Sequence, residues 1–329
     1  MQGLRVLITG GLGFIGFNLA QRLKRHQDVG SVALLDIGND FSPFRLSVQE
    51  AAEFKVYHVN VLEEHTLLEI VAEFDVVYHL AAESHVQNSI KDPRKFLHTN
   101  VMGTFAVLEA ARKWQRRLIF ASTSEVYGST QYSPIDESHP LEPQSPYAAS
   151  KLAADRLVAA YVHSYGLNAT IARMFNAFGP RQYYEKLIPM LICSALCDFP
   201  LPLQGGGSAK RDWTFVDDVS DRLAALLPES APKLINLGSG TSKTVAEIAT
   251  AIIDLVGRHD AVVERYRERP GHVSEQTVDG SAVAARIGPT KVSFEDGLRR
   301  TAAWYSIRKS AWHASFLHDR EHILNGMSG

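Results

Sequence analysis

The sequence predicts an α/β fold in which a doubly wound parallel sheet is followed by a smaller α/β lobe. Short β-rich runs alternate with helical patterns along the first half of the chain, as in βαβ units. This regular order ends at Gly179-Pro180, after which the elements are short and mixed. With 329 residues the chain is also longer than one hydrophobic core usually grows, so we expect two lobes around one cleft.

The first half of the chain contains six predicted strands. They cover residues 4–9, 31–36, 55–61, 76–82, 116–123 and the beginning of 169–180. The helical patterns between them cover residues 14–26, 93–114 and 145–166. Beyond them we expect helices over 187–196 and 214–227 and a strand at 233–240 that returns to the sheet. The first lobe is therefore predicted to comprise residues 1–175 with about 211–238, and the second lobe residues 176–210 and 239–329.

The composition is that of an ordinary globular protein, with 45% hydrophobic and 21% charged residues. A net charge of −2 gives no reason to expect a nucleic-acid or membrane-surface partner. The chain begins with a strand-like run, and its longest apolar stretches are too short to span a bilayer, so we expect a cytoplasmic protein. Cys193 and Cys197 lie four residues apart in an apolar helical pattern, which favours core packing, and we predict no metal site.

A glycine turn joins the first strand to the first helix. Gly10, Gly13 and Gly16 allow a tight turn, close approach of the backbone to a pyrophosphate, and close packing of the helix on the strand. The start of the helix then offers free N–H groups to the phosphates. Asp36 ends the next strand, where a carboxylate accepts hydrogen bonds from ribose hydroxyls and repels a 2′-phosphate. These features predict a Rossmann-type domain that binds NAD in preference to NADP; the alternative for Asp36 is a strand-end cap.

Tyr147 and Lys151 form the first part of a predicted catalytic site. They are four residues apart in the segment SPYAASK, so they share one face of a helix. A phenol titrates near pH ~10, which is too high for a base at neutral pH. We expect the lysine ammonium and the positively charged nicotinamide ring to stabilise the phenolate and lower its pKa. An exposed pair on a helix surface is the alternative, and the dinucleotide domain that precedes the pair favours catalysis.

Thr123, Ser124 and Glu125 follow at the C-terminal end of the fifth strand, where open parallel sheets bind their ligands. Thr123 can hydrogen-bond the hydroxyl that is oxidised. A carboxylate at Glu125 exceeds the needs of simple dehydrogenation, because Tyr147 already takes the hydroxyl proton. It indicates a second proton transfer, most simply at a carbon next to the new carbonyl. The alternative for Glu125 is a structural salt bridge.

Several motifs together resemble the extended short-chain dehydrogenases that act on nucleotide sugars. The motifs are GxxGxxG with Asp36, HLAAESHVQNS (79–89), STSEVYG (122–128), YAASK, RMFNAFGPRQ (173–182) and RDWTFVDDV (211–219). HLAAESHV and YYEKLIPMLI are most similar to the nucleotide-sugar 4,6-dehydratases within that family. The run over residues 122–155 is similar to the branch that acts on N-acetylhexosamine nucleotides, such as a UDP-N-acetylhexosamine.

The resemblance implies a reaction. Tyr147 with Lys151 and Thr123 would oxidise C4 of the hexose, with the hydride going to NAD. Glu125 would then remove the C5 hydrogen, water would leave from C6, and the hydride would return to C6. NAD would therefore be a bound cofactor without net redox change.

Ser124 departs from the pattern of the dTDP-glucose dehydratases, which carry Asp-Glu where this chain has Ser124-Glu125. In those enzymes the Asp is the acid that protonates the leaving C6 hydroxyl. Ser-Glu occurs in GDP-mannose dehydratases and also in UDP-glucuronate decarboxylases, for which Arg181 is the candidate positive group near the C6 carboxylate. Three alternatives to the dehydratase therefore stay open: a decarboxylase, a nucleotide-sugar 4-epimerase and a non-catalytic NAD-sensing protein.

The resemblance also supplies the remaining site residues. Besides the glycines and Asp36, the predicted cofactor site takes in Phe14, Ile15, Asn60, Val61, Leu80, Ala81, Ala82, Ser84, Thr99, Tyr147 and Lys151. The nucleotide-diphosphate sugar is assigned to Ser84, Thr123, Asn176, Arg181, Lys186, Leu187, Leu203, Gln204, Arg211, Asn236, Arg269 and His272.

Asn60, Arg211 and Gln204 are the assigned residues whose roles follow from their chemistry or their departure from the family pattern. Asn60 ends the third strand, where its amide can meet the adenine edge or simply form a turn. Arg211 is assigned to the diphosphate, because Arg can fork two oxygens. Gln204 replaces the Tyr that is usual in the dTDP-glucose enzymes. The resemblance also implies a homodimer that pairs through the helices 93–114 and 145–166.

Overall fold

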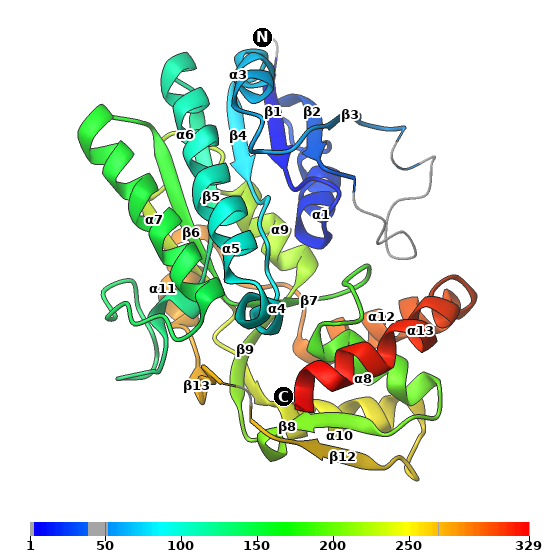
Figure 1. Cartoon of the computed structure of the whole chain (residues 1–329). Helices are drawn as coiled ribbons and strands as arrows, with labels where there is room; N and C mark the ends of the chain where they lie inside the picture. The colour runs from blue at the N-terminus through cyan, green and yellow to red at the C-terminus, as the bar shows by residue number, and fades with distance from the viewer. Residues whose placement is uncertain (1–2, 39–49, 51, 269, 329) are drawn as a thin grey trace.

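A seven-stranded parallel sheet forms the centre of the first lobe in the computed structural model, which describes residues 3–38, 50, 52–268 and 270–328 (Figure 1). Across the sheet the strands are β10 (Leu234–Leu237), β6 (Ala169–Met174), β5 (Arg117–Thr123), β4 (Val76–His79), β1 (Leu4–Thr9), β2 (Val29–Asp36) and β3 (Lys55–His58). Every neighbouring pair is parallel. The chain runs outward from β1 to β3 and then from β4 to β10 on the other side, so the predicted doubly wound sheet is confirmed.

Helices cover both faces of this sheet. On one face pack α3 (Glu64–Ala72), α6 (Gly103–Trp114) and α7 (Pro146–Tyr165). On the other face pack α1 (Phe14–Leu23) and α9 (Val216–Ala224). β4 and β5 are buried over their whole length, because side chains on both faces of these strands meet helices.

Three predicted elements end or divide where the sequence pattern gave no sign of it. The helix predicted over 93–114 consists of α5 (Pro93–Phe96), the π-helical segment Leu97–Met102 and α6. The helix predicted over 214–227 begins only at Val216, because the preceding residues extend β9 (Lys210–Phe215). The sixth predicted strand, within residues 169–180, divides at Phe175: β6 stays in the large sheet, while β7 (Asn176–Phe178) pairs with β9. The pairing of β7 with β9 sets both the division at Phe175 and the length of β9 before α9. An apolar run in the sequence does not reveal its partner strand.

The second lobe is built around its own apolar core. It contains the parallel pair β8 (Leu201–Gln204) and β12 (Val263–Tyr266), and a small sheet in which β11 (Ser242–Thr244) and β13 (Glu275–Gln276) flank β9. Its helices are α8 (Leu187–Leu196), α10 (Val245–Val256), α12 (Phe294–Ile307) and α13 (Lys309–Ser328). Cys193 lies in this core, and so do the fully buried Trp312 and Phe316 of α13. Within the described residues, none of the helices is long and apolar enough to cross a membrane.

A buried ion pair fixes α7 on the sheet. Arg173 of β6 donates from Nε to Asp155 Oδ2 of α7 at 3.0 Å and from Nη2 to Oδ1 at 3.2 Å. The Ser122 hydroxyl donates to the same carboxylate at 2.8 Å, and both charged side chains are almost fully buried. Burial alone would raise the pKa of Asp155, but hydrogen bonds and charge from Arg173 lower it overall. The pair holds the helix that carries Tyr147 and Lys151.

Replacing Arg173 with Leu leaves the Asp155 carboxylate buried without its main cation. We expect this variant to lose about 3–5 kcal/mol in the free energy of unfolding, measured by urea denaturation. The double variant Asp155→Leu/Arg173→Leu should recover at least half of that loss, because it also removes the buried carboxylate, which in the single variant keeps only the half-exposed Arg156 as a cationic partner. A double variant as unstable as the single one would contradict the assignment of the loss to a buried charge without its buried partner.

Candidate active site

A cavity of about 750 Å³ opens where the carboxyl ends of the strands face the second lobe. Its first-lobe wall contains the glycine turn and residues that follow β2, β4 and β5. Its second-lobe wall contains residues of β8 and β9 together with Glu268 and His272. The cavity spans the point between β1 and β4 where the strand order reverses, which is the usual ligand site of such sheets.

The glycine turn forms a bare backbone cradle at the start of α1. Gly10 has a φ of +70°, and a Cβ added there would lie 2.7 Å from Ala81 N. A Cβ at Gly16 would lie 2.2 Å from the Gly10 carbonyl oxygen, so neither position accepts a side chain. The Asp36 carboxylate accepts hydrogen bonds from Leu12 N at 3.0 Å and from Gly38 N at 3.2 Å. These residues fit a dinucleotide, since the turn leaves room for a pyrophosphate and places a carboxylate at the end of β2.

The structure brings the other predicted cofactor residues to the same cavity. They are Phe14, Ile15, Asn60, Val61, Leu80, Ala81, Ala82, Ser84 and Thr99. Asn60 also makes a turn, because its Oδ1 accepts a hydrogen bond from Leu62 N at 3.0 Å. Their roles toward NAD stay predictions.

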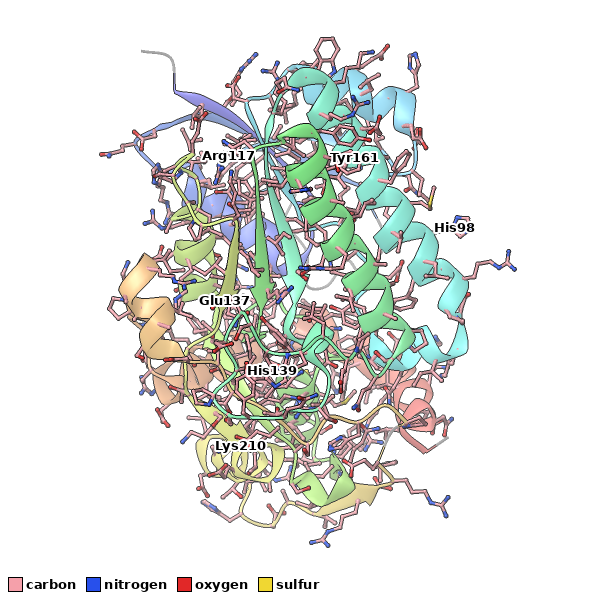
Figure 2. All side chains as sticks on the ribbon, turned by 90° about the vertical axis from the view of Figure 1, so that its left-hand side faces the viewer. His98, Arg117, Glu137, His139, Tyr161 and Lys210 are labelled. Carbon is pink, nitrogen blue, oxygen red and sulfur yellow. The ribbon has the colours of Figure 1, made fainter. Side chains whose placement is uncertain are left out.

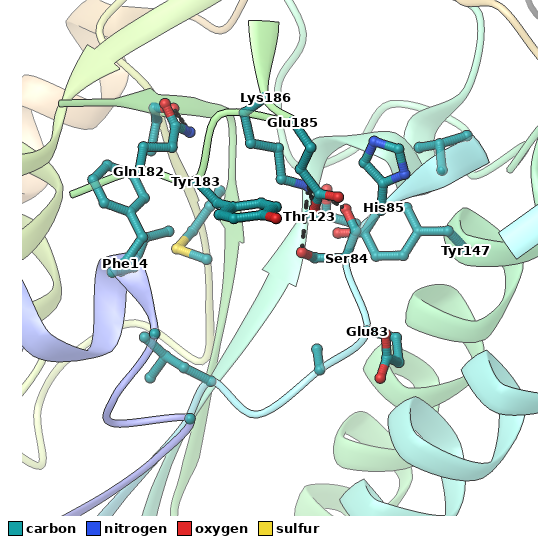
Figure 3. A pocket seen from close by; sticks show the side chains of 18 of the residues that line it. Phe14, Glu83, Ser84, His85, Thr123, Tyr147, Gln182, Tyr183, Glu185 and Lys186 are labelled. Atoms are coloured by element: carbon teal, nitrogen blue, oxygen red, sulfur yellow. Dashed lines mark hydrogen bonds and ion pairs between the residues drawn. The ribbon is translucent and has the colours of Figure 1, made fainter. Parts of the chain in front are cut away.

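Tyr147 and Lys151 reach the cavity from the first turns of α7. Ser145 caps the helix by accepting from Ala148 N at 3.1 Å, and Pro146 occupies its first position. Lys151 is buried, and its Nζ donates to the Ala121 carbonyl of β5 at 2.6 Å. The ring of Tyr147 extends from the helix toward Thr123 (Figure 3).

The residues after β5 form a tight turn, residues 124–128, that carries Glu125. Thr123 Oγ1 accepts from Glu125 N at 3.3 Å and is also hydrogen-bonded to Tyr147. Ser124 is buried, and its Oγ donates to Gln276 Oε1 at 3.1 Å. Within the described part of the chain Glu125 forms no ion pair, so the salt-bridge alternative for this residue finds no support. Thr123, Glu125 and Tyr147 thus meet in one place, as predicted.

Most of the residues assigned to the nucleotide sugar also line the cavity. These are Ser84, Thr123, Asn176, Arg181, Lys186, Leu187, Gln204, Arg211 and His272. Lys186 Nζ donates to the Ser84 carbonyl at 2.9 Å and so connects the two lobes. Arg211 donates to the carbonyls of Val273 and of Lys210, the latter at 3.0 Å.

Two of the assigned residues lie elsewhere, and one is not described. Leu203 is 4% exposed and packs in the second-lobe core, because alternate residues of β8 point to opposite faces. Asn236 is 1% exposed on β10, where its Oδ1 accepts from the Tyr127 hydroxyl at 2.6 Å. Their assignment to the substrate is therefore corrected. Arg269 lies outside the described residues.

Residues 7–301 match the family model of the GDP-mannose 4,6 dehydratases. The chain belongs to this family. A dTDP-glucose 4,6-dehydratase of Mycolicibacterium smegmatis is 35% identical over 316 residues, which cover 94% of this chain and 95% of the relative. The crystal structure of a dTDP-glucose 4,6-dehydratase from Streptomyces venezuelae with NAD bound aligns with a TM-score of 0.87 at 34% identity, over 94% and 99% of the two chains. A solved NAD-dependent NDP-hexosamine 5,6-dehydratase of tunicamycin biosynthesis aligns at 0.82 and 32% identity, over 92% and 97%. The predicted family is confirmed.

Several cavity residues of this family member were missed by the sequence reasoning. Figure 3 shows Glu83, His85, Gln182, Tyr183 and Glu185 around the cavity. All five lie within or beside motifs that carry the resemblance. Their nearness in sequence to Ser84 or Lys186 could have indicated that they line the site.

Tyr183 is held from the C-terminal helix of this dehydratase-family chain. Asp319 of α13 accepts hydrogen bonds from the Tyr183 hydroxyl, at 3.1 Å, and from the Tyr184 hydroxyl. Because Tyr183 lines the cavity, α13 contributes to the shape of the site.

The pKa values of Tyr147 and Lys151 are governed by burial. Desolvation raises the pKa of Tyr147 to about 12, which outweighs the hydrogen bond from Thr123, and the charge of Glu125 raises it further. Desolvation lowers the pKa of Lys151 to about 7 against the opposing charge of Asp155. Near neutral pH Lys151 therefore loses much of the charge that was expected to lower the pKa of Tyr147. The expectation that Lys151 lowers the pKa of Tyr147 is therefore wrong, and the expected effect of the nicotinamide ring stays a prediction.

A Lys151→Met variant tests this burial effect. The folded-state pKa of Lys151, about 7, lies below its ordinary value of 10.5, so between these values the unfolded chain binds more protons. Raising the pH from 7 to 9 should stabilise the wild type relative to Lys151→Met by up to about 2–3 kcal/mol, measured by urea unfolding at both pH values. The exposed Lys91, replaced with Met, serves as the control with the wild-type pH dependence. Parallel pH profiles for wild type and Lys151→Met would show that Lys151 does not titrate in this range.

Proposed function

We propose that this chain is an NAD-dependent nucleotide-sugar 4,6-dehydratase, a hydro-lyase. The observation that carries the proposal is the placement of the Glu125 carboxylate at the end of β5, close enough to Tyr147 for its charge to raise the phenol pKa. A second proton-transfer group beside the oxidising phenol is what elimination requires and simple dehydrogenation does not. The relatives named as dTDP-glucose 4,6-dehydratases support this assignment.

Each step is assigned to a side chain that the cavity brings together. NAD, when bound at the glycine turn, supplies hydride acceptance from C4 and hydride return to C6. Tyr147 takes the proton of the C4 hydroxyl as a phenolate, for which the positively charged nicotinamide ring would supply the stabilising charge, and Thr123 hydrogen-bonds that hydroxyl and the phenol. Lys151 donates to the Ala121 carbonyl and is a cation within the site below its pKa of about 7. Glu125 takes the proton from C5, which the C4 carbonyl acidifies, as the C6 hydroxyl leaves, and C5 regains a proton from solvent water when the hydride adds to C6.

The structure also bears on the alternatives. Decarboxylation was tied to Arg181, whose guanidinium forms an ion pair with Glu50 and lies 5.1 Å from the centre of the Phe17 ring. Phe17 directly follows Gly16, so the charge of Arg181 is already engaged beside the glycine turn. A sensor protein would have no use for the phenol of Tyr147 and the carboxylate of Glu125 placed together in the cavity. Both observations favour the dehydratase.

Product masses test the proposed function. The wild type is incubated with NAD and a panel that contains UDP-N-acetylhexosamines, dTDP-glucose, GDP-mannose and UDP-glucuronate. We expect loss of water from one of the sugars, while Glu125→Gln should bind NAD as the wild type does yet form no dehydrated product. Loss of CO2 would establish the decarboxylase. An isomer of unchanged mass that separates from the substrate on chromatography would establish the epimerase, and no turnover of any sugar would leave the sensor protein. Full activity of Glu125→Gln would remove Glu125 from its role at C5.

We further propose a homodimer that pairs through α6 and α7, which lie side by side on one outer face (Figure 2). Tyr161 of α7 bridges them by donating to Glu109 of α6 at 2.6 Å. Large apolar side chains stay exposed on and around these helices: Ile90, Leu97, Met102, Trp114 and Tyr165, between 39% and 55%. Such a face supports pairing of two copies. The cytoplasmic location stays a prediction.

Light scattering after size exclusion checks the homodimer. The wild type should elute at twice the chain mass of 36.4 kDa, and Met102→Glu should shift the mass toward a single chain, because a charge enters the apolar face. Ile307→Glu is the matched control, since Ile307 is 79% exposed on α12 in the second lobe. A Met102→Glu variant with wild-type mass would place the interface elsewhere.

A further inference from the structure

Gln276 holds the 124–128 turn from the second lobe. Its side chain is fully buried on β13 and donates from Nε2 to the Ser124 carbonyl at 3.0 Å and to the Gly128 carbonyl at 3.5 Å. Its Oε1 accepts the Ser124 hydroxyl at 3.1 Å, across 152 positions of sequence. One amide therefore binds both ends of the turn that carries Glu125.

The turn has little freedom of its own to compensate for a lost contact. Gly128 closes it at a φ of +65°, and a Cβ there would lie 1.8 Å from the Glu142 carbonyl oxygen. Gly128 N donates back to the Glu125 carbonyl at 3.2 Å, and Thr123 Oγ1 accepts from Glu125 N. The backbone of Glu125 is thus fixed from its own strand end, and the flanking carbonyls are satisfied by Gln276.

The strand that carries Gln276 also contacts the residue assigned to the diphosphate. Gln276 is in register with Arg211 in the parallel pair of β13 and β9. The Arg211 guanidinium donates to the Val273 carbonyl, three residues before Gln276. The short segment 273–276 therefore joins the second-lobe wall of the cavity to the 124–128 turn.

We propose that Gln276 is the positioning residue of Glu125, and that the Ser124 hydroxyl serves this contact and not proton donation to the leaving group. This rests on the proposed dehydratase function. In the elimination the C5–H electron pair becomes the C5=C6 double bond, the proton passes to Glu125, and the C6–O pair leaves with the oxygen. The proton on Glu125 then completes the departing water, so the Ser124 proton stays with Gln276.

Gln276→Leu tests the proposal, because it keeps the volume of the side chain and removes all three hydrogen bonds. Ser124→Ala removes only one of them. If Gln276 positions Glu125, turnover of the sugar identified in the panel should fall by about tenfold to hundredfold in Gln276→Leu, with KM within about twofold. Ser124→Ala should lose less. If Ser124 were the acid, the order of the two losses would be reversed.

A step-specific readout separates positioning from general damage. C4 oxidation depends on Tyr147 and Lys151 and should persist in Gln276→Leu, so reduced nicotinamide should accumulate during turnover, seen by its absorbance. Hydrogen–deuterium exchange of the amides of residues 124–128, measured without substrate, should accelerate in the same variant. Thr130→Val is the matched control: Thr130 donates to the Glu275 carbonyl next to Gln276, this hydrogen bond does not involve residues 124–128, and the variant should match the wild type in both readouts.

Three results would overturn the proposal. They are unchanged exchange and turnover in Gln276→Leu, an equal loss of C4 oxidation and elimination, and a larger loss in Ser124→Ala than in Gln276→Leu. A wild type that converts none of the sugars would instead overturn the proposed function and the catalytic part of this inference. Amide exchange would still decide whether Gln276 holds the turn.

Discussion

The seating of α7 on the large sheet is the constraint on which the site depends. Asp155 and Arg173 meet in a buried ion pair, and one helical turn before Asp155 the Lys151 ammonium reaches the Ala121 carbonyl. Both contacts join α7 to neighbouring strands, so the helix has one rotational setting. Tyr147, one turn further toward the N-terminus, is then directed at Thr123, and its ring also packs edge-on against Phe96. Because separating the buried charges of Asp155 and Arg173 would be costly, the ion pair keeps α7, and with it the phenol of Tyr147, in place.

The main apolar cores of the two lobes are separate, and the lobes are joined beside the cavity by a small apolar cluster that includes Val126, Tyr127 and Val278 and by polar contacts. Lys186 reaches the Ser84 carbonyl, and Gln276 reaches the 124–128 turn. Hydrogen bonds are directional, whereas apolar packing tolerates small shifts, so polar contacts are suited to aligning reacting groups. A substrate that contacts both walls would meet side chains whose spacing these bonds define.

Local sequence patterns were sufficient to predict the large sheet and the dinucleotide cradle. Strand and helix periodicity gave the sheet, and the spacing of Gly10, Gly13 and Gly16 before α1 gave the dinucleotide cradle. What the sequence could not show depends on partners far along the chain. β7 leaves the large sheet for β9, and Asn236 turns toward Tyr127. The pKa of Tyr147 moves against expectation because burial is a property of the folded environment and not of a four-residue spacing.

The family model matches the chain as far as residue 301, and the folded lobe continues beyond that point. α13 follows that point and fills the second-lobe core with Trp312 and Phe316, while Asp319 holds the two tyrosines beside the cavity. A chain cut at residue 301 would uncover apolar surface of the second-lobe core and release Tyr183 from Asp319. Substitutions in α13 can therefore reshape the pocket while every motif of the first lobe stays intact.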